Sequence, residues 1–271
     1  MRTFATLLCF ALTIVCRPAF SDDTSLGIDE KLKAVYDLYR TSNVVTLKQH
    51  EFDIGLSFGY ALNETRVLDL QDTARTLSAV TSVGYGITNG IQLSVMVPFL
   101  YQTHLAQDTT TTHLDTRASG LGDVTVGIAA TLPTKTVSTT MLVSAMLPTA
   151  DDDLGSKGVV TSAGFNVDKV MQPAFVYGGI SWVRDWDAKK DSVGYNAGVG
   201  FFLNYALSIG AGLEGGFAFN PALGAAHDTM ALVGKVSYQV TPSFGFTPSI
   251  SLGLTEKSPD VALGLAMVWR F

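Results

Sequence analysis

Five charged residues stand apart in a sequence that is otherwise poor in charge. They are Asp53, Arg75, Asp123, Glu214 and Lys235. We predict that all five line the interior of a barrel, where such groups either orient a polar solute or pair with one another. Glu214 and Lys235 fall on adjacent predicted strands, and the alternation within each strand points both inward, which predicts an ion pair. Asp123 is a candidate either to orient a substrate or to pair with a lumen base such as Arg75. We favour the structural interpretation because ion-pair networks explain most such groups without a function.

Metal and catalytic chemistry have little support in this sequence. The aspartates at 151–153 are consecutive and lack the alternating Asp-x-Asp-x-Asp-Gly spacing of a calcium loop. The four histidines show no metal-ligand spacing. His227 with Ser192 or Ser208 is the nearest approach to a hydrolytic pair, and no motif surrounds it. We therefore expect no metal, no cofactor and no enzymatic activity.

The N-terminus has the layout of a secretory signal peptide over residues 1–21. A basic start at Arg2 precedes a short apolar run, and Ala19-Phe20-Ser21 supplies the cleavage signal. Both cysteines lie in this segment, so the mature chain has no thiol. The remaining 16 basic and 24 acidic residues give a net charge of about −8, which disfavours nucleic-acid binding.

Residues 22–45 are predicted to form a periplasmic amphipathic leader helix. Apolar residues recur on one helical face, at Ile28, Leu32, Val35, Tyr36 and Tyr39. A helix of this kind packs on the rim of a barrel, plugs its lumen or joins subunits, and the first of these is the simplest interpretation.

From residue 46 to the end of the chain, apolar residues alternate with small or polar ones. We count twelve runs, at about 47–62, 75–87, 91–101, 120–132, 136–148, 159–171, 174–184, 192–203, 207–219, 229–240, 243–254 and 260–271. Most strands of soluble proteins are about five or six residues long, whereas a tilted membrane-spanning strand needs about 9–11. The connections alternate between long and short, as in an up-and-down barrel with tight periplasmic turns.

The residue types on the two faces of these runs indicate whether lipid or water surrounds the barrel. One face carries large apolar residues and the other mainly Gly, Ser, Ala and Thr, and charged residues are only 15% of the chain, where soluble proteins have about 25%. The apolar face therefore points to lipid, which predicts an all-β fold: a twelve-stranded antiparallel transmembrane β-barrel over residues 46–271, with the short helical leader before it. The uncharged stretch at 195–213 is long enough for a membrane helix, but its period of two favours two strands.

The C-terminal run ends in Met267, Trp269 and Phe271 and resembles the terminal signal that the outer-membrane assembly machinery recognises. Three further stretches, at 86–99, 120–127 and 147–149, make residues 80–271 similar to the transporter-type barrels of the meta-pathway of phenol degradation family. The resemblance implies a bacterial-type outer membrane, contact with membrane lipids and uptake of small, often hydrophobic, molecules. Ala150 departs from the family pattern, in which a glycine is expected after Pro148-Thr149.

A twelve-stranded barrel has a backbone diameter of roughly 24 Å. A lining of small residues would leave part of that width open, which favours a channel or transporter for a small-molecule solute. The alternative is a non-conducting structural or interaction barrel, with its lumen filled and a periplasmic partner docked on the N-terminal helix.

Overall fold

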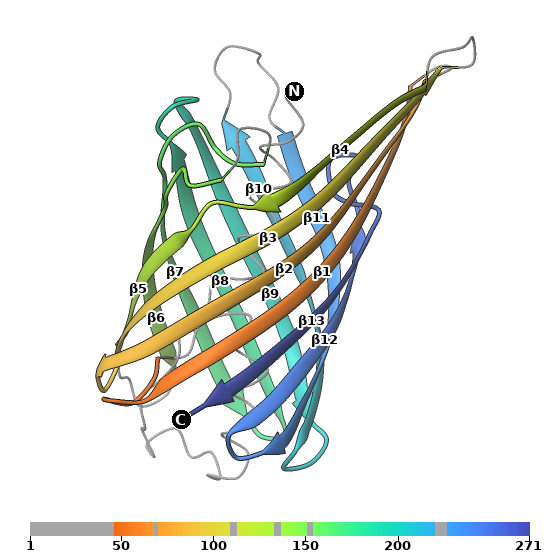
Figure 1. Cartoon of the computed structure of the whole chain (residues 1–271). Helices are drawn as coiled ribbons and strands as arrows, with labels where there is room; N and C mark the ends of the chain where they lie inside the picture. Colours follow the sequence, from red (N-terminus) through yellow and green to blue (C-terminus); the bar gives the residue numbers. More distant parts are fainter. Residues whose placement is uncertain (1–45, 68–69, 109–112, 133–136, 151–153, 220–226) are drawn as a thin grey trace.

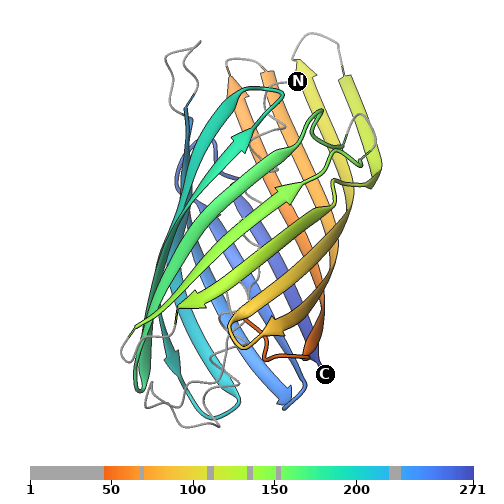
Figure 2. The ribbon, with the colours of Figure 1, turned by 90° about the vertical axis from the view of Figure 1, so that its left-hand side faces the viewer.

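The computed structural model describes residues 46–67, 70–108, 113–132, 137–150, 154–219 and 227–271, and these form a tall β-barrel (Figures 1 and 2). Every regular element in these residues is a strand. In chain order the strands are β1 (Phe52–Val67), β2 (Leu70–Thr88), β3 (Ile91–Asp108), β4 (His113–Leu121), β5 (Thr125–Leu132), β6 (Ser138–Met146), β7 (Val160–Met171), β8 (Ala174–Asp185), β9 (Lys190–Phe202), β10 (Leu207–Phe219), β11 (His227–Thr241), β12 (Phe244–Gly253) and β13 (Val261–Arg270).

The strands close into a ring with twelve positions, which confirms the predicted fold class. Each strand pairs antiparallel with its neighbours, and β1 pairs with both β2 and β13. β4 and β5 both pair with β3, so they are two halves of one barrel strand that is interrupted at residues 122–124. The interruption leaves Gly122 bonded to the Pro98 carbonyl at 2.8 Å. Pro98 cannot donate to the sheet, yet its oxygen still accepts.

Alternate side chains of the strands face outward, and most of those in the lower part of the barrel are large and apolar. On β1, Phe52, Ile54 and Phe58 are exposed, and the same holds for alternate residues of the other strands. Burying such a face in lipid is favourable, and a closed ring leaves no backbone amide of the sheet unpaired in the hydrocarbon. No helix in the described residues is long and apolar enough to cross a membrane. The stretch at 195–213 lies in β9 and β10, as its period of two predicted.

Two of the predicted long loops are wrong. Residues 63–74 and 102–119 were expected as outer loops, but β1 and β2 pair from Phe52↔Tyr85 up to Val67↔Leu70, and β3 pairs with β4 up to Gln107↔His113. The hairpins project above the rest of the barrel at the upper right of Figure 1. Hydrophobicity reports only the part of a strand that meets lipid, whereas backbone pairing continues into water without apolar side chains.

The predicted start of the first strand is also wrong, because β1 begins at Phe52 and not at residue 47. The barrel closes beside this point. The backbone of Phe52 exchanges two hydrogen bonds with that of Phe271, at 3.1 and 2.9 Å, and their rings stack with centroids 4.7 Å apart. The C-terminus thus lies at the same end as the tight turns (Figure 1). The predicted signal peptide, residues 1–21, and the predicted leader helix, residues 22–45, fall on residues 1–45, which lie outside the described residues.

Candidate functional site in the barrel lumen

The lumen wall formed by β12, β13, β1 and β2 carries a row of small residues. Strand register brings Ser249, Gly264, Gly59 and Ser78 into one row across these four strands, all facing inward. The spacing is so close that a Cβ atom on Gly59 would lie 2.6 Å from the Ser78 Oγ. The row borders a cavity of about 160 Å³ inside the barrel.

The same cavity has an apolar side that the alternation did not predict. Val80, Met96, Leu100 and Met146 line it, and each is at most 8% exposed. We had expected this face to carry mainly Gly, Ser, Ala and Thr. The signal was available at 95–101, Val-Met-Val-Pro-Phe-Leu-Tyr, where both parities are apolar. A strand that is apolar on both faces touches lipid on one side and an apolar interior on the other.

Glu214 and Lys235 form the predicted ion pair. The Lys235 Nζ donates to the Glu214 Oε1 at 3.0 Å, and the two side chains are 5% and 7% exposed. The second carboxylate oxygen, Oε2, is buried and has no hydrogen-bond partner among the described residues. Glu214 is in register with Asn196, which donates to Asn166 at 3.3 Å. A polar band therefore runs from β7 to β11 on this side of the lumen.

Asp123 anchors a loop instead of pairing with Arg75. Its Oδ1 accepts from the amides of Thr149 and Ala150, both at 3.0 Å. Its Oδ2 accepts from the Ser156 amide at 2.6 Å and from the Ser156 hydroxyl at 2.7 Å. The carboxylate is 3% exposed and all its near partners come from the β6–β7 connection. This arrangement matches the structural interpretation of Asp123.

Arg75 does not face the lumen, so its predicted position is wrong. It is in register with Leu62 and Thr103 and is exposed. It therefore lies on the same outward face as Leu77, which is 50% exposed. The run that begins at residue 75 carries its apolar residues at odd positions, and Arg75 shares that parity.

The opening at the end with the tight turns holds the first described residues. Thr46 and Leu47 are 0% and 1% exposed. The Leu47 amide donates to the Gln92 Oε1 at 3.2 Å, and the Thr46 hydroxyl lies 3.1 Å from that of Thr131. Asp53 is 5% exposed on the neighbouring part of β1, in register with Arg270. Its inward position matches the prediction.

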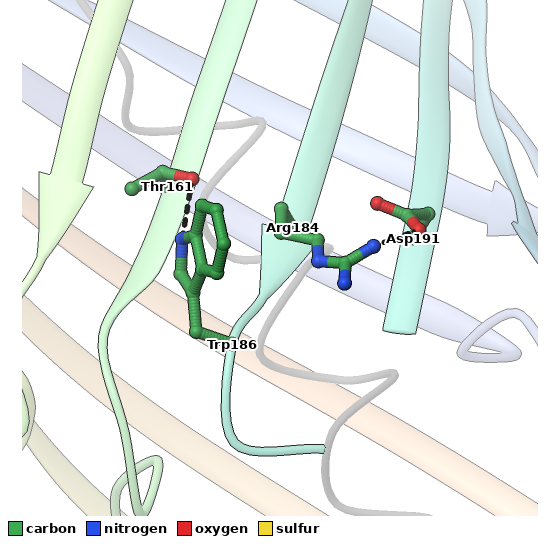
Figure 3. A network of polar contacts seen from close by, with 4 residues as sticks. All are labelled: Thr161, Arg184, Trp186 and Asp191. Carbon is green, nitrogen blue, oxygen red and sulfur yellow. Dashed lines mark hydrogen bonds and ion pairs between the residues drawn. The ribbon is translucent and has the colours of Figure 1, made fainter. Parts of the chain in front are cut away.

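Polar side chains form a row on the outer face of β7, β8 and β9, at the end of the barrel opposite the tight turns (Figure 3). Arg184 bonds to Asp191 at 2.5 Å, and its guanidinium lies 5.4 Å from the ring centroid of Trp186. The Trp186 indole donates to the Thr161 hydroxyl at 3.0 Å. Tryptophan and paired charges of this kind are typical of the membrane–water interface. We infer that the lipid-facing band ends here on these strands.

The described residues contain no group of three or more potential metal ligands. Residues 151–153 and the side chain of His227 lie outside the described part. Register places Ser192 and His227 on opposite sides of Ala218, with the whole of β10 between their strands. Ser208 lies at the far end of β10 and is fully buried. The geometry therefore offers no support for a hydrolytic site at the rim.

Comparisons with known proteins agree with this architecture. A family model described as "Putative MetA-pathway of phenol degradation" matches residues 17–271. No curated protein matches the sequence. The barrel is similar to the COG4313 outer membrane channel from Pseudomonas putida F1, with a TM-score of 0.63 and 15% identity over 83% of this chain and 97% of that one. It is also similar to the translocator domain of autotransporter NalP from Neisseria meningitidis, with a TM-score of 0.54 and 11% identity over 93% and 99%. These likenesses show the fold, that of outer-membrane β-barrels.

Proposed function

This chain belongs to the "Putative MetA-pathway of phenol degradation" family, and on that premise we propose that it is a channel for small, including hydrophobic, molecules in the outer membrane. The observation that carries the proposal is the lumen. Its row of small residues, Gly59, Gly264, Ser78 and Ser249, borders a cavity of about 160 Å³ inside a closed barrel with an apolar exterior. The solved structure with the highest similarity quoted above is itself named an outer membrane channel.

The channel performs no chemistry in this proposal. Its work is to provide a path whose walls interact weakly with the solute. Small side chains keep the path wide, and the apolar lining lowers the cost of admitting solutes that water solvates poorly.

We further propose that the leader at 22–45, once the signal at 1–21 is removed, regulates access from the periplasmic end. The support comes from the residues that directly follow it. Thr46 and Leu47 are buried in the opening and hydrogen-bonded to the barrel through Gln92 and Thr131, so the chain reaches the lumen before it joins the sheet.

Planar-bilayer conductance tests the channel and the leader together. We expect small current steps from the mature protein and larger ones after deletion of residues 22–43. Leu47→Asp should act in the same direction, because a carboxylate is costly at a position only 1% exposed. Gln49→Asp is the matched control, since it places the same charge on an exposed neighbour. A barrel that stays closed after the deletion would favour the alternative, an interaction barrel with a periplasmic partner on its leader.

The C-terminal residue gives a separate prediction about assembly. Phe271 is 61% exposed, completes the pairing with Phe52 and stacks on its ring. We propose that this end is what the outer-membrane assembly machinery engages. Deleting Phe271 should therefore lower the amount of heat-modifiable, folded barrel in the outer membrane several-fold. Leu203→Ala, another exposed apolar residue beside a tight turn, should leave that amount unchanged.

A further inference from the structure

Two arginines lie on the outer face of the barrel, on the strands that flank β3. Register aligns Arg75 of β2 with Thr103 of β3, and Thr103 with Arg117 of β4. Both arginines are exposed. Neighbouring strands are about 4.8 Å apart, so about 10 Å separates the two arginine backbones, and their long side chains can meet over the Thr103 hydroxyl. Arg117 already makes a contact, but a guanidinium carries five N–H donors, so others can bind a ligand. Paired guanidinium groups favour a phosphate.

The next row of outward side chains marks the level at which the lipid-facing surface ends. It contains Tyr60, Leu77 and Tyr101, which register aligns on β1, β2 and β3. Leu77 and Tyr101 are 50% and 37% exposed, and tyrosine is enriched where acyl chains give way to headgroups. The arginines come one row farther from the tight turns, so they lie at the height of the headgroups. The tight turns of such barrels face the periplasm, and these headgroups therefore belong to the outer leaflet.

A groove of about 450 Å³ supplies an independent indication of the ligand, because it lies on the same outer face directly below the arginines. Its floor is Ala79, which register places between Phe58 of β1 and Phe99 of β3. The two phenylalanines are 44% and 49% exposed, so the small Ala79 leaves a depression between them. The other large side chains of the groove are Tyr60, Leu77, Tyr101, Leu263 and Leu265. A groove of this composition in a lipid-facing wall suits an acyl chain.

We propose that this wall binds one phosphorylated glycolipid of the outer leaflet, with a phosphate on Arg75 and Arg117 and an acyl chain in the groove over Ala79. A free phosphate would use the arginines alone, whereas a lipid uses both parts. The β1–β2 hairpin continues past the arginines up to Val67↔Leu70, so it offers a surface to a sugar headgroup that a small phospholipid headgroup does not reach. The bound lipid holds the part of the wall from which the hairpins project (Figure 1). The site lies outside the lumen and does not depend on the proposed channel.

Native mass spectrometry of the mature protein in detergent tests the site, with lipid A as the probe. We expect one equivalent of lipid A to bind, and phosphatidylglycerol, which has a phosphate and acyl chains but no sugar, to bind more weakly. Arg75→Gln with Arg117→Gln should raise the dissociation constant for lipid A at least about tenfold, because it removes hydrogen bonds between charged groups. The matched control is Lys157→Gln with Lys257→Gln, which makes the same change of charge on two exposed connections and should leave binding unchanged.

A second pair of variants tests the groove. Ala79→Phe fills it and should weaken the binding of lipid A, whereas Ala211→Phe adds the same ring to the outer face of β10, beside Val199, and should not. Heat-modifiable migration checks that each variant is folded.

Three results would overturn the proposal. The first is unchanged binding of lipid A to the folded double arginine variant, and the second is equal affinity for lipid A and phosphatidylglycerol. The third is displacement of lipid A by millimolar inorganic phosphate at constant ionic strength, which would show that the arginines hold the free anion. Weaker binding in Ala211→Phe as well as in Ala79→Phe would mean that lipid covers the whole outer face without a specific groove, and would overturn the site in the same way.

Discussion

Replacing Lys235 by Met will lower the free energy of unfolding by about 3–5 kcal/mol, the usual cost of leaving one partner of a buried ion pair alone. The pair qualifies as buried because both side chains are at most 7% exposed. Without the ammonium group, the Glu214 carboxylate remains among apolar and small side chains with neither oxygen paired to Lys235. The cost is the desolvation of that carboxylate, which the ion pair now offsets.

The double variant Glu214→Leu with Lys235→Met should recover most of this loss. Replacing both charges with apolar groups of similar volume is often neutral or stabilising, since no charge then needs desolvation. Urea unfolding of each variant in lipid vesicles measures the effect. The control is Lys257→Met, on an exposed loop, which should change the free energy of unfolding by no more than about 0.5 kcal/mol. If the single variant costs less than 1 kcal/mol, water in the lumen solvates the pair and the lumen is wetter than its burial indicates.

The fold could be predicted from the sequence because a membrane imposes a strict rule. Lipid demands a paired backbone and an apolar exterior, so a period of two repeated twelve times admits few folds. Outside the membrane the rule no longer applies. The upper parts of the β1–β2 and β3–β4 hairpins were therefore mistaken for loops, since strands in water need no alternation.

The lumen was predicted less completely, because the sequence gives the parity of a residue but not what lies across the barrel. Glu214 and Lys235 could be paired from parity and strand adjacency, and their contact confirms it. Arg75 was assigned to the lumen because it is charged, although the alternation within its own run points it outward. The structure places it on the outer face. The Asp123 contacts with Thr149 and Ser156 depend on how a loop folds back, which no period encodes.

Removing the Asp123 carboxylate will release the β6–β7 connection. Asp123→Ala deletes four hydrogen bonds to an ionised group, three from backbone amides and one from the Ser156 hydroxyl. Bonds to charged groups contribute about 1.5–3 kcal/mol each, so the amides of Thr149, Ala150 and Ser156 should exchange with deuterium about 10–100 times faster.

The amides of the barrel strands should stay protected from exchange, because the four hydrogen bonds of the Asp123 carboxylate all go to the β6–β7 connection. Ser156→Ala removes a single hydroxyl donor and should have a smaller effect on the same amides. Glu256→Ala, at an exposed position of the β12–β13 connection, should leave them unchanged. Unaltered exchange at Ser156 in Asp123→Ala would mean that packing of Leu154, which is 5% exposed, holds the loop without the carboxylate. Because Asp123 also borders the cavity, the loop it holds fixes one side of the path through the lumen.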